Sequence, residues 1–326
     1  MYDNFANALN DLRILVAEEF SAMESFITHN SNSGVEYISN IIKHLVLSGG
    51  KRTRPLLHLA ACGLLECTDK RRIAVAAAIE CIHSATLLHD DVVDKSDLRR
   101  GVRTANSIWG NKASILVGDF LFAVSFQWIV GCNNLPVLSI LSGASSVIIT
   151  GEIQQMVHSE KIDISQQKYL EIISAKTAVL FSAACEAAAA LADAPAFRKP
   201  LRSFGNNFGI AFQILDDILD YTARSTETGK ATCNDILQGK VTLPLIVAYE
   251  NADAKTRAAI SNELAKPSPN AEVVCAFIKE LNAIEKSVEI AKHYAYLAMY
   301  ELDLCPDSKF KTALKLLLHS ATNRRF

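Results

Sequence analysis

The chain has 326 residues, half of them hydrophobic, and carries 33 Lys and Arg against 35 Asp and Glu, for a formal net charge of −2. A charge so close to zero gives no basis for a nucleic-acid-binding surface. The 14 Gly and 8 Pro are spread thinly and leave no linker-like tract, so although the length would allow two domains, we expect a single domain over residues 1–326.

Helical periodicity dominates the chain. It predicts helices at residues 5–28, 35–48, 54–67, 70–91, 107–130, 135–158, 165–191, 197–221, 241–251, 253–265, 270–280, 282–303 and 307–322. Turn residues support several ends: Gly49 and Gly50 close one helix, and Pro55 suits the first turn of the next. Strand-like alternation is essentially missing. We therefore predict an all-α fold whose central helices, apolar nearly all round, are surrounded by others.

The cysteines predict thiols and not a zinc site. They stand at positions 62, 67, 81, 132, 185, 233, 275 and 305, mostly in apolar segments and with no C-x-x-C pair. We expect small buried thiols in a reducing compartment, and, because the acidic N-terminal segment lacks the pattern of a signal peptide, a cytoplasmic location. The apolar stretches 135–149 and 179–192 are short or are interrupted by Glu186, so we predict no membrane span.

Two acidic cassettes each follow a long apolar helical run. Their aspartates are Asp90, Asp91 and Asp94 in LLHDDVVD, and Asp216, Asp217 and Asp220 in FQILDDILD. Residues three or four apart share a helix face, so each cassette concentrates carboxylates at one place. Mg²⁺ is usually held by one or two carboxylates together with substrate phosphates. The pair of cassettes therefore predicts Mg²⁺ ions that hold a diphosphate, whereas a single cassette would more often be a solvated helix end.

Several basic segments would suit such an anion. The segment GGKRTRP places three cations at a predicted helix start, where backbone N–H groups also attract anions. Each of the other segments, taken singly, is equally well explained by surface charge or by a lysine that reaches out to solvent. The candidate cations are Lys51, Arg52, Arg54, Arg99, Arg100, Lys176, Lys230 and Lys240.

The motifs together resemble one enzyme family. GGKRTRP, LLHDDVVDKSDLRRG, VGDFLF, GEIQQM, SAKTAVLF, FQILDDILDY and a late GK-x-TLP occur in the order and spacing of the trans-isoprenyl diphosphate synthases, over about residues 35–250. The motif sequences are most similar to those of bacterial long-chain members, such as the octaprenyl diphosphate synthases that make the ubiquinone side chain. The resemblance implies a single bundle of about ten or more antiparallel helices around a deep central cavity, and a homodimer.

The resemblance also implies the substrates and the site residues. Isopentenyl diphosphate would be added to an allylic diphosphate (farnesyl or geranylgeranyl), with about three Mg²⁺ ions per site and Mn²⁺ able to replace them. The six cassette aspartates would bind the metal. The allylic diphosphate would contact Arg99, Lys176 and Lys230. Isopentenyl diphosphate would be held by Lys51, Arg54, His83 and Arg100. Thr177 and Gln213 would lie near the reacting carbons, and Lys240 would close over the site.

Product length should depend on the helix before the first cassette. Short-chain relatives block the tunnel for the growing chain with aromatic residues four or five positions upstream, where this chain has Ala85 and Thr86. One or two turns deeper, Cys81, Ala78 and Ala77 are also small. We therefore predict an open tunnel and a product of about octaprenyl length. Candidates for the floor, which are equally well explained as ordinary core, are Phe122, Phe126, Trp128 and Ile129.

Four alternatives remain open at this level: a shorter-chain synthase, a terpene cyclase, a regulatory subunit of a heteromeric synthase, and a helical phosphohydrolase using His83 and His89 with Asp90. The segment GGKRTRP implies a site for a second diphosphate, which argues against a cyclase. The retained aspartates argue against a regulatory subunit. One departure from the family pattern is Asn234 before Asp235, where many long-chain members have two aspartates. Arg324 and Arg325 resemble a basic tail that covers the second diphosphate, or are simply solvated.

Overall fold

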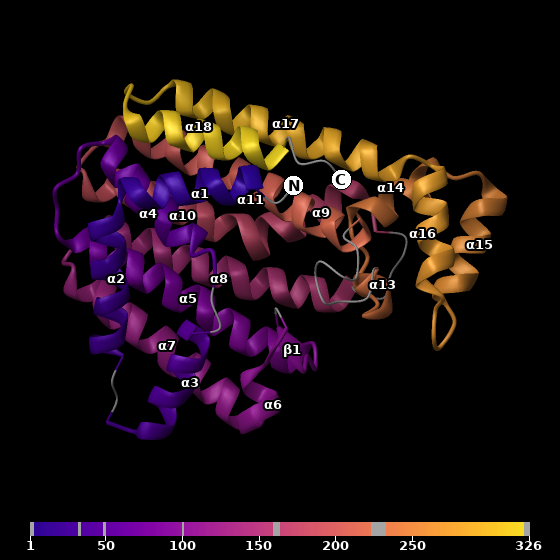
Figure 1. Ribbon diagram of the computed structural model, residues 1–326, viewed down its shortest axis with the longest axis horizontal. Helices are drawn as coiled ribbons and strands as arrows, with labels where there is room; N and C mark the ends of the chain where they lie inside the picture. Colours follow the sequence, from indigo (N-terminus) through magenta and orange to yellow (C-terminus); the bar gives the residue numbers. More distant parts are fainter. Residues whose placement is uncertain are drawn as a thin grey trace.

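The computed structural model describes residues 3–31, 34–47, 50–99, 101–158, 164–222 and 233–322, which are almost wholly helical (Figure 1). The all-α prediction is confirmed. The elements in chain order are α1 (Asp3–Leu15), α2 (Ala17–Asn30), α3 (Glu36–Leu47), α4 (Thr53–Leu64), α5 (Arg71–Val93), β1 (Leu98–Arg99), β2 (Val102–Arg103), α6 (Ala105–Trp109), α7 (Asn111–Gly131), α8 (Leu135–His158), α9 (Gln166–Ile173), the π-helical turn η1 (Ser174–Ala178), α10 (Val179–Leu191), α11 (Pro195–Thr222), α13 (Asn234–Leu237), α14 (Leu243–Asn251), α15 (Ala254–Leu264), α16 (Ala271–Glu280), α17 (Ala283–Asp303) and α18 (Lys309–Thr322).

Local backbone geometry divides two of the predicted helices. The segment predicted as 5–28 is broken at Val16, whose ψ of 29° leaves the helical range, so α1 and α2 are separate. The segment predicted as 107–130 is broken at Gly110, which has a φ of +85° that favours glycine. Between the first cassette and α6, the short antiparallel ladder β1–β2 pairs Leu98 with Arg103. Strands of two residues carry no readable alternation, and the sequence pattern therefore missed them.

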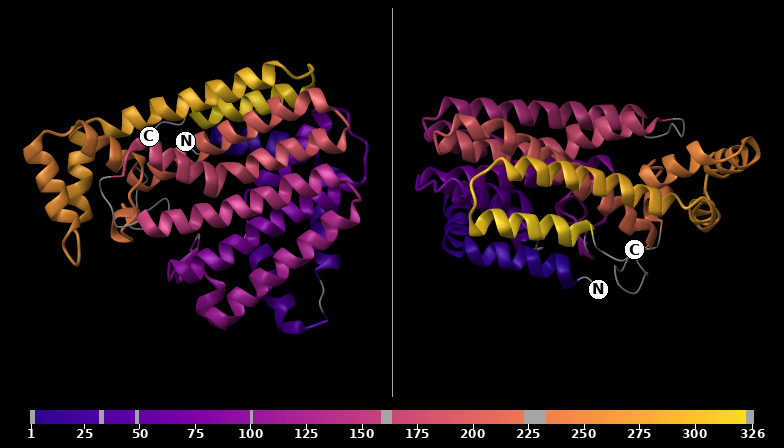
Figure 2. Two further views of the ribbon diagram at one scale, coloured as in Figure 1. Left: turned by 180° about the vertical axis from the view of Figure 1, so that it is seen from behind. Right: turned by 90° about the horizontal axis from the view of Figure 1, so that it is seen from above.

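The long helices run roughly along one direction, while α2 and the pair α15 and α16 run across it (Figure 1). Helix α10 contacts α4, α5, α8 and α11, which places it inside the bundle. Six of its 13 residues are alanine, and the helix is buried on nearly every side, so small residues here allow close helix approach. The first and last helices, α1 and α18, lie side by side (Figures 1 and 2).

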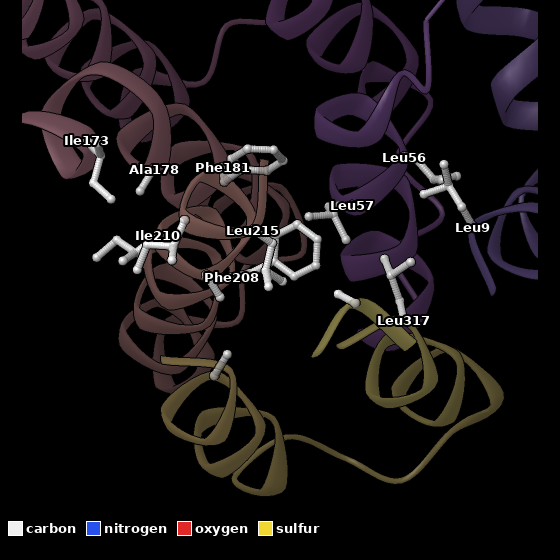
Figure 3. Packing of buried hydrophobic residues seen from close by; sticks show 14 of the residues in the cluster. Leu9, Leu56, Leu57, Ile173, Ala178, Phe181, Phe208, Ile210, Leu215 and Leu317 are labelled. Carbon is white, nitrogen blue, oxygen red and sulfur yellow. The ribbon is translucent and has the colours of Figure 1, made fainter. Parts of the chain in front are cut away.

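The apolar core forms two clusters. The larger one joins α1, α4, α10, α11 and α18 and contains Leu9, Leu57, Phe181, Phe208 and Leu317 (Figure 3). The smaller one lies between α5, α7, α8 and α10. Aromatic rings add contact within the larger cluster, where the Phe181 and Phe208 centroids are 5.4 Å apart in an edge-on arrangement.

Replacing Gly205 with alanine should destabilise the fold by about 1–3 kcal/mol, because two helices would have to separate. A Cβ at Gly205 of α11 would lie 2.4 Å from the backbone oxygen of Phe181 on α10. The matched control is Gly143→Ala in α8, where a Cβ would meet nothing within 4 Å. The control should be stabilised by about 0.5–1 kcal/mol through its higher helix propensity. Urea unfolding of both variants measures the contrast, and equal effects would contradict the packing argument.

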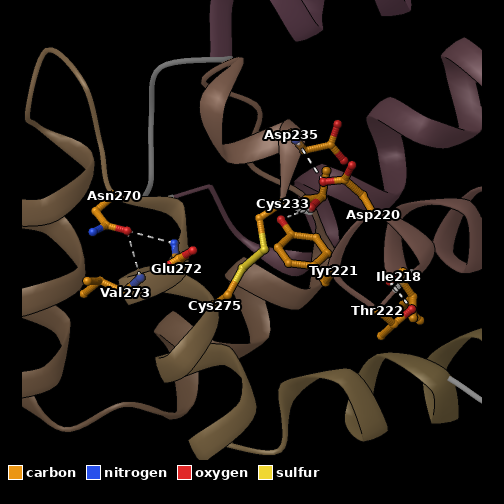
Figure 4. The surroundings of a disulfide bond; sticks show 11 residues. Ile218, Asp220, Tyr221, Thr222, Cys233, Asp235, Asn270, Glu272, Val273 and Cys275 are labelled. Atoms are coloured by element: carbon orange, nitrogen blue, oxygen red, sulfur yellow. Dashed lines mark hydrogen bonds between the residues drawn. A yellow bond between two sulfur atoms is a disulfide. The ribbon is translucent and has the colours of Figure 1, made fainter. Parts of the chain in front are cut away.

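A disulfide joins Cys233, just before α13, to Cys275 of α16 (Figure 4). The prediction that all cysteines are thiols is therefore wrong for this pair. The two residues are 42 positions apart, and only the packing of α13 against α16 brings their side chains together, so no spacing rule could reveal the bond. The other six cysteines are free thiols, and all but Cys67 are buried.

Within the described part of the chain, four helical segments are long and apolar enough, by length and composition alone, to cross a membrane: α5, α7, residues 135–157 of α8, and residues 166–191. The prediction that the stretches 135–149 and 179–192 are too short or too interrupted to span a membrane is wrong by this criterion. Each helix extends well beyond the apolar stretch on which the prediction was based. In the bundle, 72% of the most apolar window of residues 166–191 is buried, against 33% for that of α8. Helix α8 therefore keeps a large part of its apolar surface exposed.

Candidate active site

The first cassette lies at the C-terminal end of α5, and each of its aspartates pairs with a cation from another segment. Asp90 Oδ2 is 3.6 Å from Lys176 Nζ. Asp91 is buried, and its Oδ1 accepts from Arg99 Nε and lies 2.9 Å from Arg99 Nη2. Asp94, at the C-cap, accepts from Lys240 Nζ at 2.9 Å. The short β1–β2 ladder thus serves to bring Arg99 back over the helix end.

The π turn η1 positions Lys176 between two carboxylates. Lys176 Nζ donates to Glu152 Oε2 of α8 at 2.7 Å in addition to its contact with Asp90. Gly151 allows this approach, since a Cβ there would lie 2.9 Å from the backbone N of Lys176. Burial lowers the pKa of Lys176, but the charges of Asp90 and Glu152 outweigh it, and the net pKa is raised. Lys176 therefore stays cationic inside the bundle. π turns inside helices are frequent at functional sites.

The second cassette lies near the C-terminal end of α11, and its residues differ in exposure. Asp216 is exposed, whereas Asp217 is buried. Asp217 accepts from Tyr169 Oη at 2.6 Å and from Gln213 Nε2 at 2.8 Å. Burial is the main cause that raises the pKa of Asp217 to about 8, with Asp235 adding to it and the two hydrogen bonds opposing it. A cation bound beside the Asp217 carboxylate would be needed to keep it ionised.

Two chains of contacts connect the cassettes. In one, Thr177, the neighbour of Lys176, donates to Gln213 Oε1 at 2.9 Å, and Gln213 donates onward to Asp217. In the other, Lys240 contacts Asp94 through its side chain and the carbonyl of Asp235 through its backbone N–H. The backbone N–H of Asp235 in turn donates to Asp220 Oδ2 (Figure 4). These contacts bring the two helix ends to one site.

Of the residues expected to hold a second diphosphate, Arg54 and His83 come into contact at the start of α4, and Lys51 lies just before that helix. Arg54 Nη1 is 3.0 Å from His83 Nε2 of α5, and its guanidinium lies 4.3 Å from the centre of the Phe181 ring. Lys51 is exposed, and its Nζ lies 5.0 Å from the centre of the Phe5 ring. Arg52 takes a different direction and forms an ion pair with the buried Glu80 of α5. Arg52 of the GGKRTRP segment thus links the start of α4 to α5.

The donor set suits a hard divalent cation that binds together with its substrate. Within the described ranges, no three His, Cys, Asp or Glu side chains converge closely enough to hold a metal ion. Carboxylate oxygens are nevertheless the ligands Mg²⁺ prefers, and this ion usually takes only one or two of them and completes its shell with water and phosphate oxygens. The two cassettes fit that arrangement, with Asp94 and Asp216 exposed and Asp90 partly buried.

Some candidates lie outside the described residues, and some contributors had no sequence signal. Arg100, Lys230, Arg324 and Arg325 are in the first group. Glu152, Tyr169 and Glu80 were not predicted. Glu152 stands in the GEIQQM motif and could have been suspected there. The residues next to Tyr169 and Glu80 in the sequence do not indicate which distant side chains these two residues contact.

The contacts of the two histidines do not support a phosphohydrolase metal site. His83 contacts Arg54, whereas His89 Nε2 lies 3.3 Å from Asp119 Oδ1 and 3.2 Å from the carbonyl of Ile115, both on α7. Gly118 provides the room, because a Cβ there would lie 2.3 Å from the ring of His89. The two imidazoles therefore face different helices and cannot share one ion with Asp90.

The residues expected to set product length line the interior of α5 and α7. Ala85 and Ala78 are fully buried, and Cys81 is 2% exposed. Thr86 donates its hydroxyl to the carbonyl of His83. On α7, the partly buried Trp128 packs edge-on against Phe26 of α2 at 5.1 Å between centroids. The remaining candidates of α7 that contact the smaller core cluster are Phe122, Phe126 and Ile129.

The sequence is similar to those of known prenyl diphosphate synthases. The family model described as Polyprenyl synthetase matches residues 35–281. The chain is 40% identical to an all-trans-nonaprenyl-diphosphate synthase (geranyl-diphosphate specific) of Rhodobacter capsulatus, over 96% of this chain and 97% of the relative. It is 36% identical to an octaprenyl diphosphate synthase of Escherichia coli, over 97% and 99%.

A solved structure shares the fold and was obtained with ligands. The crystal structure of a polyprenyl synthase from Caulobacter crescentus, complexed with calcium and isoprenyl diphosphate, superposes with a TM-score of 0.91 at 38% identity and covers 98% of both chains. The matched family model spans most of this chain, and the relatives match it over nearly their whole length. The chain therefore belongs to the polyprenyl synthetase family and is a prenyltransferase, a trans-prenyl diphosphate synthase.

Proposed function

We propose that this enzyme is a long-chain synthase, which extends an allylic diphosphate with isopentenyl units to about octaprenyl length for a quinone side chain. The observation that carries the proposal is the row of small, buried side chains on α5, Ala85, Cys81 and Ala78, which leads away from Asp90. Residues four and seven positions apart share a helix face, so the row lies along one line. A growing apolar chain could follow it without meeting a bulky side chain.

The charges of the site suit two diphosphates on opposite sides. The six cassette aspartates would hold Mg²⁺, which supplies charge stabilisation for the leaving diphosphate. Lys176, kept cationic by its two carboxylate neighbours, lies beside Asp90 and could exchange that contact for a phosphate oxygen. Arg54 and Lys51 lie at the start of α4, where a second diphosphate would find cations and helix N–H groups.

The chain's own residues also exclude water from the reacting carbons. Thr177 and Gln213 are hydrogen-bonded to each other, and their neighbours in sequence, Ala178 and Ile214, belong to the larger apolar cluster. An allylic cation would react with water if water were present, so a dry wall beneath a polar rim favours attack by the isopentenyl double bond.

Incubation with Mg²⁺, farnesyl diphosphate and labelled isopentenyl diphosphate, followed by sizing of the products, tests the proposal. We expect incorporation of several isopentenyl units and a product of about octaprenyl length. A product of about twenty carbons would support the shorter-chain alternative. No incorporation, with recovery on addition of another subunit, would support a regulatory or heteromeric role.

We further propose that the enzyme is a homodimer joined through the exposed apolar surface of α7 and α8. Exposed large side chains on these helices are Ile115, Leu116, Val130, Leu135, Val147, Ile149, Ile153, Met156 and Val157. So many exposed large apolar side chains on two contacting helices are unusual on a monomer and typical of an interface.

The double variant Leu116→Glu with Ile153→Glu should weaken this dimer about 100-fold or more, because each new carboxylate would be buried without a partner. The control is Tyr296→Glu on α17, a residue that is equally exposed but lies outside the surface. Light scattering during size-exclusion chromatography measures the mass. An unchanged mass in the double variant would place any interface elsewhere.

A further inference from the structure

Two cysteines meet at the C-terminal end of α4, far along the chain from both cassettes. The helix ends with a backbone motif in which the N–H of Cys67 donates to the carbonyl of Cys62 at 2.9 Å and the N–H of Glu66 donates to Gly63. Glu66 occupies the left-handed position, with φ of +53°. This is the Schellman arrangement, and it brings the side chains at the first and last of these positions into contact. Here both side chains are thiols.

The Cys62 thiol lies between two acceptors. His58 Nδ1 donates to the carbonyl of Ala184 at 2.8 Å, which leaves Nε2 without a proton, and Nε2 lies 3.7 Å from Cys62 Sγ. Burial lowers the pKa of His58 to about 4, so the ring is a neutral acceptor at physiological pH. The Cys67 sulfur is the alternative acceptor for the same S–H proton.

The two thiols therefore differ in acidity. The hydrogen bond to Cys67, followed by burial, raises the pKa of Cys62. The same hydrogen bond lowers the pKa of Cys67 to about 6, although burial opposes it. The charged groups that act on the pKa of Cys67 are Asp69 beside it and Arg72 at the start of α5. Arg72 is itself held by Glu19 of α2 at 3.2 Å.

Access distinguishes Cys67 from the other thiols. Among the free thiols within the described ranges, Cys67 is the one that is not buried. It also packs against both apolar clusters, so it lies where the larger and smaller cores meet at the end of the bundle. A reagent from solvent can therefore reach Cys67, whereas Cys62 is buried.

We propose that Cys67 and Cys62 form a reactive dithiol site, in which Cys67 is the thiolate that attacks a soft electrophile and Cys62 is the thiol that resolves the product. Nothing in the prenyl-transfer chemistry uses this site. The electrophile class is a hydroperoxide or a low-molecular-weight disulfide.

The reaction with a hydroperoxide balances as follows. The Cys67 thiolate attacks the terminal peroxide oxygen, the O–O bond breaks, and Cys67 becomes a sulfenic acid while hydroxide or alkoxide leaves. The Cys62 sulfur then attacks the Cys67 sulfur, and its proton passes, directly or through His58 Nε2, to the leaving hydroxide, which departs as water. Two thiols lose two electrons to form the Cys62–Cys67 disulfide, and the peroxide is reduced by the same two electrons.

Pulse alkylation of the full-length protein, with peptide mapping by mass spectrometry, tests the first step. We expect Cys67 to be labelled before the other thiols, with a pH midpoint near 6. Near pH 6.5 it should react about 5- to 10-fold faster than the same cysteine in the urea-unfolded chain, because the larger thiolate fraction exceeds the loss of nucleophilicity. Labelling with an ordinary thiol midpoint would overturn the proposal.

Treatment with one equivalent of hydrogen peroxide tests the second step. We expect a Cys62–Cys67 linked peptide lighter by two hydrogens, with Cys233–Cys275 unchanged. In Cys62→Ser, a sulfenic acid should accumulate on Cys67 and be captured by dimedone. In Cys67→Ser, Cys62 should stay reduced. The matched control is Cys132→Ser, a buried thiol of α7 whose pKa burial raises, and it should behave as the native protein. Absence of the linked peptide, or of the captured Cys67 adduct, would overturn the assignment.

Discussion

Replacing Asp217 with asparagine is expected to lower kcat/KM by about 10²–10³-fold and, at the same time, to stabilise the metal-free protein at pH 8. The first effect follows because the second cassette loses a metal-binding carboxylate. The second follows because the carboxylate of Asp217 is buried beside Asp235, with a pKa raised to about 8. A neutral amide of the same shape removes that electrostatic cost, and Gln213 can turn its amide to hydrogen-bond with it.

The pH dependence gives the stability effect its sign. The usual pKa of aspartate, 3.8, applies to the unfolded chain, and the folded pKa of Asp217 is about 8. Between these values the folded state binds more protons than the unfolded state, so the unfolding free energy of the native protein falls as pH rises. The penalty is absent below both values and complete above pH 8. At pH 8 the asparagine variant should be more stable by about 2–5 kcal/mol.

Asp216→Asn is the matched control because the neighbouring aspartate belongs to the same cassette but is exposed. It should lose activity without a gain in stability. Urea unfolding in the presence of a chelator, from about pH 4 to pH 9, measures both variants, and added Mg²⁺ should then stabilise the native protein more than either. A native unfolding free energy that does not fall with pH, or equal stability of the two variants, would contradict the buried-carboxylate argument.

Sequence patterns predicted the helices and the identity of the charged groups, because both depend on local spacing. The apolar period fixed α8 and α14 to α18 closely, and the two cassettes stood out because five-residue acidic repeats after apolar runs are locally unusual. The facing of the cassettes followed from the resemblance to a known family. In the structure it depends on long-range contacts, such as Lys240 with Asp94, which are 146 residues apart.

The remaining features depend on tertiary packing and had no local pattern. Arg52 looked like a third anion-binding cation, but the buried Glu80 holds it. The π turn at Ser174–Ala178 lies within an unbroken helical period, and it changes which side chains face the site. The Tyr169 hydroxyl reaches Asp217 from 48 residues away. In each case the decisive partner belongs to another helix, and the spacing within one helix does not identify it.

Replacing Ala85 with tyrosine is expected to shorten the product to about farnesyl or geranylgeranyl length, while the first condensation continues. The methyl group of Ala85 is fully buried on α5, about one and a half helical turns before Asp90, so a phenol there would block the row that continues to Cys81 and Ala78. If the row borders a tunnel, the ring occupies that space with little loss of stability.

Ala76→Tyr provides the control. Ala76 is equally buried on the same helix, but it lies nine residues from Ala85, and at about 100° per residue it therefore faces the opposite side of α5. A tyrosine there should overpack the core and cost about 1–3 kcal/mol without changing product length. Chromatographic sizing of labelled products, together with urea unfolding of both variants, separates the two effects. If Ala85→Tyr made the native product while losing as much stability as Ala76→Tyr, then Ala85 would be ordinary core, and the growing chain would have to pass along a different helix.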